Sequence, residues 1–442
     1  MFYLIIVLFI LGYTAIAFEQ NLPVSKAAIA LVTGVLIWVC IAFGGDTMEV
    51  TRHELVGHLG RIGEMLFYLL GVMTIVEIIE SHGGFNLLHK IIKTTKKVLL
   101  LWIFSFLTFF LSAVFDNLAI TVVMITLIWK FVGSNTMRCF FAGMIVIAAN
   151  AGGAWSPIGN VTTIILWIGG QVSAWNIIMQ LFVPSLICML VPLIIISISL
   201  KGETVHPSRT ENAKSPVPTT DRERWTFLLS GIGGLMLVPV FKSVTQLPPY
   251  LGVMLVLSIL WMMTEILHRK KQKELKIRLT LPEIVKKIDI STIFFLLGVL
   301  LAVAGLQSAG HLHIAGNFLN EKVHNAYAIN LIIGTLSSVV DNVSLVAGTM
   351  GMYEIVTPDA WAAISNPEQA AYLKNFVVDG SFWELLAYSA GTGGSILIIG
   401  SSAGVAAMGL ANLDFRWYLK KISWLAFAGF LSGFAAYCLI VK

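Results

Sequence analysis

The seven residues Leu111-Ser-Ala-Val-Phe-Asp116-Asn117 recur 225 positions later, with two substitutions, as Leu336-Ser-Ser-Val-Val-Asp341-Asn342. Each copy lies near the middle of an apolar stretch, about 99–130 and 328–353, where a straight lipid-facing helix could least tolerate an acid. A turn at membrane depth is tolerated only where protein or a wet cavity covers it. We therefore predict that both stretches are re-entrant hairpins, which turn at the Asp-Asn pair and return to the same side.

The composition around these hairpins excludes a water-soluble fold. Of the 442 residues, 57% are hydrophobic and only 12% are charged, whereas a soluble domain is about 25% charged. Further apolar segments are long enough to cross about 30 Å of hydrocarbon as helix. We predict an all-α polytopic membrane protein with about ten full spans: 2–18, 27–44, 60–81, 138–169, 178–200, 226–243, 249–268, 290–308, 381–412 and 422–441.

Two further matches extend the repeat in the same order along the chain. The stretch Phe67-Tyr-Leu-Leu-Gly-Val72 recurs as Phe294-Phe-Leu-Leu-Gly-Val299, and the glycines at 152, 153 and 159 recur at 393, 394 and 400. The sequence therefore predicts two structural repeats of one plan. The predicted units are N-terminal helices 1–59, a first repeat 60–200, a linker with two spans 201–289, and a second repeat 290–442.

The distribution of positive charge orients these units. When the loops are alternated across the membrane, 23 of the 29 Lys and Arg residues fall on one side, which the positive-inside rule makes the cytoplasmic side. The repeats then run antiparallel, an arrangement typical of transporters. We expect a multi-pass protein of the bacterial inner membrane with both termini outside. The net charge of +5 reflects topology and contact with membrane lipids, not nucleic acid.

Segments 138–169 and 381–412 are too long for one straight span and are interrupted by glycines. We predict helix breaks at Asn150–Asn160, which contains a proline, and at Ser389–Ser395. Unwound carbonyls and neutral side-chain oxygens would suit Na+ or Li+. The alternative is that the glycines serve close packing and the polar residues cap half-helices. Paired breaks in matching repeat positions favour a cation site.

Four acids are candidates for coupling a cation to a proton. Asp116 and Asp341 lie at hairpin depth, where a carboxylate is costly unless it binds a cation or a proton. Helix capping is the structural alternative, although a serine would serve for that. Glu64 and Glu77 are candidates for a proton path, because their counterparts 227 positions later are not acidic. Placement near the ends of the span is the alternative for these two.

Other activities receive less support from the sequence. The histidines of His53-Glu-Leu-Val-Gly-His58 are five positions apart, not the four of a zinc protease helix. An intramembrane hydrolase, the alternative from a different class, is therefore not favoured by this motif. No phosphate-binding loop is present, so we expect a carrier that is driven by an ion gradient, is not an enzyme and needs no cofactor. Another carrier, of arsenite or an organic anion, stays open; an anion carrier would be expected to place Arg or Lys near the site.

Several motifs together resemble the NhaD family of Na+/H+ antiporters, within the ion-transporter superfamily of arsenite-efflux and dicarboxylate carriers. The resemblance covers most of the chain. The motifs that carry it are Thr74-Ile-Val-Glu77, Phe115-Asp116-Asn117, Asn150-Ala-Gly-Gly-Ala-Trp-Ser156-Pro-Ile-Gly159, Val161-Thr162-Thr163, Val340-Asp341-Asn342, Gly391-Thr392-Gly-Gly-Ser395 and Gly400-Ser401.

The resemblance implies exchange of Na+ or Li+ for H+, a role in pH homeostasis, and an elevator-like motion of the hairpins and broken helices. Na+ or Li+ is expected at Asp116, Asn150 and Asp341. The full set of expected cation-site and proton-site residues is Asp116, Asn117, Asn150, Ser156, Asn160, Thr162, Thr163, Asp341, Asn342, Thr392, Ser395 and Ser401.

Two features of the resemblance leave alternatives open. The family pattern reads Ser-Pro-Ile-Gly-Asp where this chain has Asn160, which cannot ionise. Either the coupling acid lies elsewhere in this chain, or its exchange is weakened. A homodimer is expected from the superfamily. Gly429 and Gly433, four apart in the last span, pack either between protomers or within one.

Overall fold

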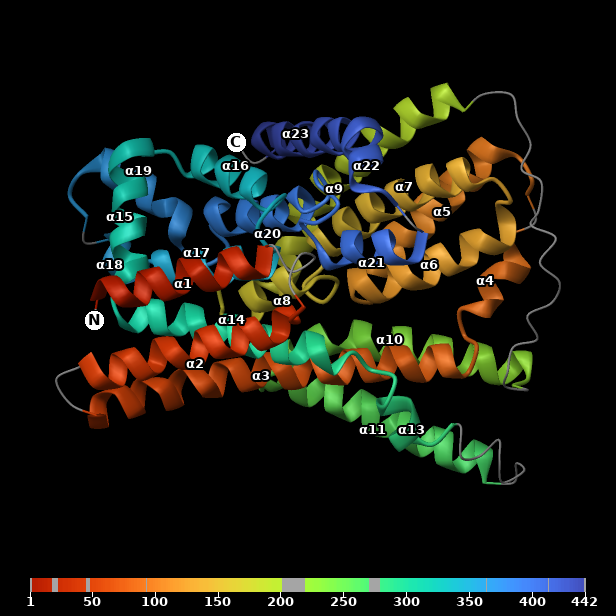
Figure 1. The fold of residues 1–442 in the computed structure, drawn as a ribbon, viewed down its shortest axis with the longest axis horizontal. Coiled ribbons are helices and arrows are strands. Elements are labelled where there is room, and N and C mark those ends of the chain that lie inside the picture. The colour runs from red at the N-terminus through yellow and green to blue at the C-terminus, as the bar shows by residue number, and fades with distance from the viewer. Residues whose placement is uncertain are drawn as a thin grey trace.

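The computed structural model describes residues 2–17, 23–44, 48–92, 94–200, 219–269, 279–362, 364–411 and 413–440. All regular elements in these ranges are helices (Figure 1). Within the predicted unit 201–289, residues 201–218 and 270–278 lie outside the described residues. In the described ranges, eight helices are long and apolar enough to cross a membrane: α2 (Lys26–Gly44), α3 (Met48–Ser81), α7 (Asn135–Ala154), α9 (Ala174–Ser199), α10 (Asp221–Thr245), α11 (Pro249–His268), α14 (Ile290–Ser308) and α23 (Ser423–Ile440).

These eight, together with α1 (Phe2–Ala17) and a two-part unit of α20 (Ser381–Gly393) and α21 (Ser402–Ala411), correspond to the ten predicted spans. The chain is therefore a multi-pass membrane protein. One boundary differs clearly, because α3 begins at Met48 and not near residue 60. The remaining short helices are α4 (Asn86–Ile91), α13 (Leu281–Val285), α15 (His311–Val323), α18 (Pro358–Ala362), α19 (Pro367–Leu373), a 3-10 turn (Lys374–Phe376) and α22 (Phe415–Lys421).

Both predicted hairpins are present. The first consists of α5 (Lys97–Ser112) and α6 (Asn117–Phe131), and the second of α16 (Ala326–Leu336) and α17 (Asn342–Met352). In each hairpin the aspartate of the Asp-Asn pair is the N-cap of the returning helix. Figure 1 shows the first hairpin towards the right end of the molecule, beside α4, and the second towards the left end, beside α15. The hairpins thus enter from opposite ends, as inverted repeats require.

The two repeats make the same hairpin-to-helix contacts. Ser112 donates a hydrogen bond to the carbonyl of Ala149 (2.7 Å), and Ser337 donates one to the carbonyl of Ala390 (2.8 Å). A Cβ on Gly152 would lie 2.2 Å from the backbone oxygen of Phe109. A Cβ on Gly393 would lie 2.1 Å from that of Gly334. These positions match at the same sequence offsets as the motifs, so the repeat of the sequence is also a repeat of packing.

The broken helices confirm the general prediction but correct its positions. The first helix is interrupted at 155–160, between α7 and α8 (Val161–Ile168), and the second at 394–401, between α20 and α21. Asn150 and Ser389 therefore still lie in helix. Pro157 explains the first break, because proline has no backbone N–H to donate a helical hydrogen bond to the carbonyl of residue 153. The second stretch contains no proline, and helical hydrogen bonding continues through its first glycines.

A second group of helices, α2, α3, α10, α11 and α14, forms the lower layer in Figure 1. Within it α2 and α14 approach closely at small residues, since a Cβ on Gly298 would lie 2.4 Å from the backbone of Ala30. The indole of Trp38 also donates to the carbonyl of Leu301 (2.9 Å). This layer supports the hairpins and broken helices from one side.

The last span packs within the chain. A Cβ on Gly429 would lie 2.3 Å from the carbonyl oxygen of Cys188, and one on Gly433 would lie 2.4 Å from that of Pro184, both on α9. Of the two alternatives that the sequence left open, the structure therefore shows packing inside one protomer for these glycines.

We expect Gly152→Ala and Gly393→Ala each to destabilise the protein by about 1–3 kcal/mol, because the added methyl group meets backbone that cannot rotate away. Thermal unfolding of the purified protein in detergent measures the effect. Gly233→Ala is the matched control: it lies in α10 with open space at its Cβ position, so it should leave the melting temperature unchanged or raise it slightly. Equal melting temperatures for all three variants would contradict the close contact.

Candidate functional site

The centre of the site is Asn150, which lies on α7 one turn before the first break and is fully buried. Its side-chain oxygen accepts a hydrogen bond from the amide of Asn117 (2.8 Å). Its own amide donates to the hydroxyls of Ser395 (2.8 Å) and Ser401 (2.9 Å). The Asn150 side chain therefore joins the first hairpin and the first broken helix to the second break, about 250 positions further along the chain.

Asp116 stands next to this junction. One of its carboxylate oxygens accepts from the backbone amide of Leu118 (3.1 Å), which caps α6. Its other oxygen is buried and has no hydrogen-bond partner in the described part of the chain. Buried carboxylate oxygens are rarely left without a partner. The free oxygen is thus able to accept a cation or a proton.

The first break contributes further polar atoms that lack hydrogen-bond partners among the described residues. Asn160 caps α8, with its oxygen 3.5 Å from the amide of Thr162, while its amide nitrogen and the hydroxyl of Thr162 are buried without a described partner. Thr163 donates to the backbone carbonyl of Asn160 (2.8 Å). A Cβ on Gly391, in the second broken helix, would lie 3.5 Å from the Asn160 amide nitrogen. Asn160 thus faces the other repeat.

Asp341 is placed differently from Asp116. One oxygen of Asp341 accepts from the backbone amides of Val343 (3.1 Å) and Ser344 (3.3 Å) and from the Ser344 hydroxyl (3.3 Å). The ammonium group of Lys26, at the start of α2, is close enough to interact electrostatically with this carboxylate. The side-chain nitrogen of Asn342 is buried without a described partner. No hydrogen bond recorded for these residues joins Asp341 or Asn342 to the Asn150 junction.

Two other predicted residues make local bonds. The Ser156 hydroxyl accepts from the amide of Ile158 (3.4 Å) inside the first break. The Thr392 hydroxyl donates to the carbonyl of Tyr388 (2.6 Å) in its own helix. Both oxygens keep a lone pair for a further contact.

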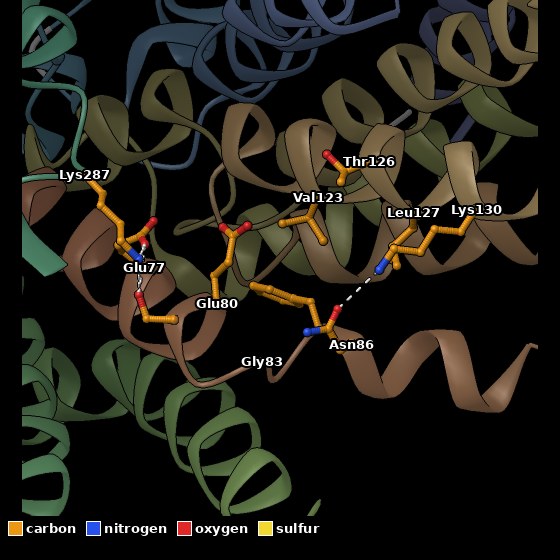
Figure 2. Close-up of a pocket in the computed structure, with 11 residues that line it drawn as sticks. Glu77, Glu80, Gly83, Asn86, Val123, Thr126, Leu127, Lys130 and Lys287 are labelled. Carbon is orange, nitrogen blue, oxygen red and sulfur yellow. Dashed lines mark hydrogen bonds and ion pairs between the residues drawn. The ribbon is translucent and has the colours of Figure 1, made fainter. Parts of the chain in front are cut away.

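The glutamates predicted for a proton path line two separate cavities along α3, Glu77 near the C-terminal end of the helix and Glu64 near its middle. Glu77 lines a cavity of about 430 Å³, in which it pairs with Lys287 (3.1 Å), as Figure 2 shows. Glu64 lines a cavity of about 540 Å³. The second cavity also contains Ala304 and Gln307, the repeat counterparts of Glu77 and Glu80. The cavities are therefore related by the repeat, but only one has acids at these positions.

Sequence reasoning missed three participants. Ser112 and Ser337 hold the hairpins on the broken helices, and both belong to the repeated Leu-Ser-x-Val-x-Asp-Asn motif, so their recurrence was a usable signal. Tyr418, in α22, donates to the carbonyl of Ser395 (2.8 Å) and carried no such signal.

Comparison with known proteins agrees with this arrangement. The citrate transporter family matches residues 5–372. Sodium/proton antiporter 1 of Arabidopsis thaliana is 42% identical over 97% of this chain and 71% of its own length. Sodium/proton antiporter 2 of the same plant is 40% identical over 97% of both chains. The Na(+)/H(+) antiporter NhaD of Vibrio cholerae is 31% identical over 96% of this chain and 88% of its own.

These relatives are membrane carriers, not enzymes, and they align with the present chain over nearly all of its length, including both hairpins and both broken helices. The chain belongs to the citrate transporter family, among the NhaD-type Na+/H+ antiporters.

Proposed function

We propose that this protein exchanges Na+ or Li+ for protons across the bacterial inner membrane, with both termini outside. The observation that carries the proposal is the Asp116 carboxylate, one oxygen of which is buried and has no hydrogen-bond partner among the described residues, next to the Asn117–Asn150 bond that leads on to the second break. The names of the relatives support Na+ and H+ as the exchanged ions.

The coupling follows from the cost of a bare charge at membrane depth. An ionised Asp116 has no ion-pair partner among the described residues, so it needs either a metal cation or a proton before it can cross a low-dielectric region. Both loaded forms are neutral and can change sides, whereas the empty form cannot. Competition of Na+ and H+ for one carboxylate therefore gives exchange and suppresses leakage of either ion.

The ligands suit a small hard cation better than an anion. Carboxylate, amide and hydroxyl oxygens surround the junction, and none of the residues in the two breaks, 155–160 and 394–401, is Lys or Arg. The matched family is named after citrate, which is an anion. The absence of Lys and Arg from the two breaks therefore distinguishes the proposed site from a site for such a substrate. An organic anion would require compensating positive charge, which the breaks do not offer.

The motion that we propose is elevator-like. Ser112, Ser337 and Asn150 tie the hairpins and broken helices into one hydrogen-bonded unit, while α2 and α14 form a separate tightly packed pair. The first unit would slide against the second and expose the junction to the two cavities in turn. Glu77 and Glu64 would then deliver protons or cations from the two cavities.

The first test is proton flux in proteoliposomes that carry an imposed pH gradient, followed with a pH-sensitive dye. Addition of Na+ or Li+ should collapse the gradient, and K+ should not. A gradient that responds to arsenite or citrate but to no alkali cation would overturn the proposed function.

We expect Asp116→Asn to abolish Na+-dependent proton movement in the same assay. Asparagine caps helices about as well as aspartate, so the fold should be preserved while the exchangeable charge is lost. Asp414→Asn is the matched control, because Asp414 caps α22 by the same type of bond (3.1 Å to the Trp417 amide) at an exposed position. Exchange that persists in Asp116→Asn, or that is lost equally in Asp414→Asn, would contradict the assigned role.

We expect Asn160→Asp to lower the KM for Na+ about tenfold, which corresponds to about 1.4 kcal/mol of added attraction for the cation. The unpaired amide nitrogen of Asn160 would be replaced by a carboxylate oxygen facing the second repeat. Asn160→Ser, which retains a capping oxygen without charge, is the control and should not lower the KM. An unchanged KM in Asn160→Asp would show that this position does not contact the ion, and that exchange rests on Asp116 without it.

A further inference from the structure

The cavity at the Glu77 end of α3 leads towards Asp116 but does not reach it. Its walls include Val123, Thr126, Leu127 and Lys130 of α6, and Figure 2 shows Glu80 and Val123 on facing walls of this cavity. Asp116 caps the other end of the same helix, seven residues before Val123, which is about 10 Å along the helix axis. An ion in the cavity must therefore still cross about two helical turns to reach the carboxylate.

Two aromatic rings in contact connect the lining of the cavity to the residue next to the acid. Phe85 lines the cavity and is only 4% exposed, and Phe115, which immediately precedes Asp116, is fully buried. Their ring centroids are 5.6 Å apart, with an interplanar angle of 83°. This is the favoured edge-to-face geometry, which fills the space between the two side chains. An ion that passed here would lose its hydration shell without gaining ligands.

The two rings come from different parts of the fold. Phe85 is the N-cap of α4 and follows a turn at Gly83, whose positive φ of 75° favours glycine; this turn continues directly from α3 in the lower layer. Phe115 lies in the turn of the first hairpin. Any displacement of the hairpin relative to α3 therefore separates the rings. We propose that Phe85 and Phe115 form the gate that closes the Glu77–Glu80 cavity from Asp116 in this conformation.

The second repeat provides an internal comparison. The counterparts of Phe85 and Phe115 are Leu312 and Val340, at the same offsets as the repeated motifs. Neither is aromatic, so an edge-to-face ring contact exists in one repeat only. The gate therefore lies on one side of the carrier only. On that side the cavity is lined by Glu77 and Glu80, whereas the repeat-related cavity has Ala304 and Gln307 at the matching positions.

The inference rests on the proposed function, but it can be tested without transport. The reporter is Asp116→Cys in a chain whose four native cysteines, Cys40, Cys139, Cys188 and Cys438, are replaced by alanine. Membrane vesicles of both orientations are exposed to the membrane-impermeant cationic thiol reagent 2-(trimethylammonium)ethyl methanethiosulfonate, and the rate of modification is followed by mass spectrometry. Because the readout is access to residue 116, it does not depend on which ion the protein carries.

Adding Phe85→Ala should raise the modification rate about tenfold, the factor that loss of one aromatic pair can account for, and only in the vesicle orientation that exposes the Glu77–Glu80 cavity. Leu312→Ala, the repeat-matched control, should leave the rate from that side unchanged. Phe115→Leu should act like Phe85→Ala, and the double variant should add little, because both changes remove the same contact. Size-exclusion profiles identify any variant that fails to fold.

An unchanged rate in Phe85→Ala and in Phe115→Leu would overturn the gate even if Na+/H+ exchange is established. Conversely, an increased rate from one side would support the gate even if the exchanged ions proved to be different. In the chain with Asp116 intact, Phe85→Ala should also allow Na+ efflux without a matching proton influx, measured with 22Na+ and a pH dye in the same proteoliposomes.

Discussion

The structure depends on one constraint: polar backbone that is unwound inside a membrane must be covered by protein. Segments 155–160 and 394–401 leave helix at a depth where lipid offers no hydrogen bonds. The hairpins provide the cover, and they approach so closely that Gly152 and Gly393 have no room for a side chain. Ser112 and Ser337 then bond to carbonyls of the covered helices. The two hairpins, the close-packed glycines and the two serines therefore all serve to keep the unwound backbone of the broken helices away from lipid.

The same shelter brings the two breaks together. Asn150 donates to both Ser395 and Ser401, so hydroxyl groups of the second repeat lie at the proposed cation site, whose acid, Asp116, comes from the first. The repeat counterpart of Asn150 is Gly391, and the lack of a side chain there makes space for Asn160. Two symmetric sites are thus replaced by a single asymmetric one. Asp341 lies within electrostatic reach of Lys26, whereas Asp116 has no ion-pair partner among the described residues.

The sequence predicted the features that depend on short motifs within one segment of the chain. The hairpins and the repeat followed from the duplicated Asp-Asn motif, and the first break followed from Pro157. The second break was expected too early, because glycines alone do not unwind a helix whose hydrogen bonds are protected by tight packing, as Thr392 and Gly393 show. The proximity of Asn160 to Gly391 could not be read at all, since it joins residues 231 positions apart through packing between the repeats.

Symmetry and asymmetry serve different needs in such a carrier. Contacts that must hold equally well in both end states are those of backbone and small residues, and these are duplicated between the repeats. The ion, by contrast, needs ligands at only one place, near the axis that relates the repeats, so side chains there can diverge. A second equal site would bind a second ion and raise the charge to be moved. Duplicated packing around unduplicated side chains is therefore the arrangement that the proposed exchange requires, and this chain has both.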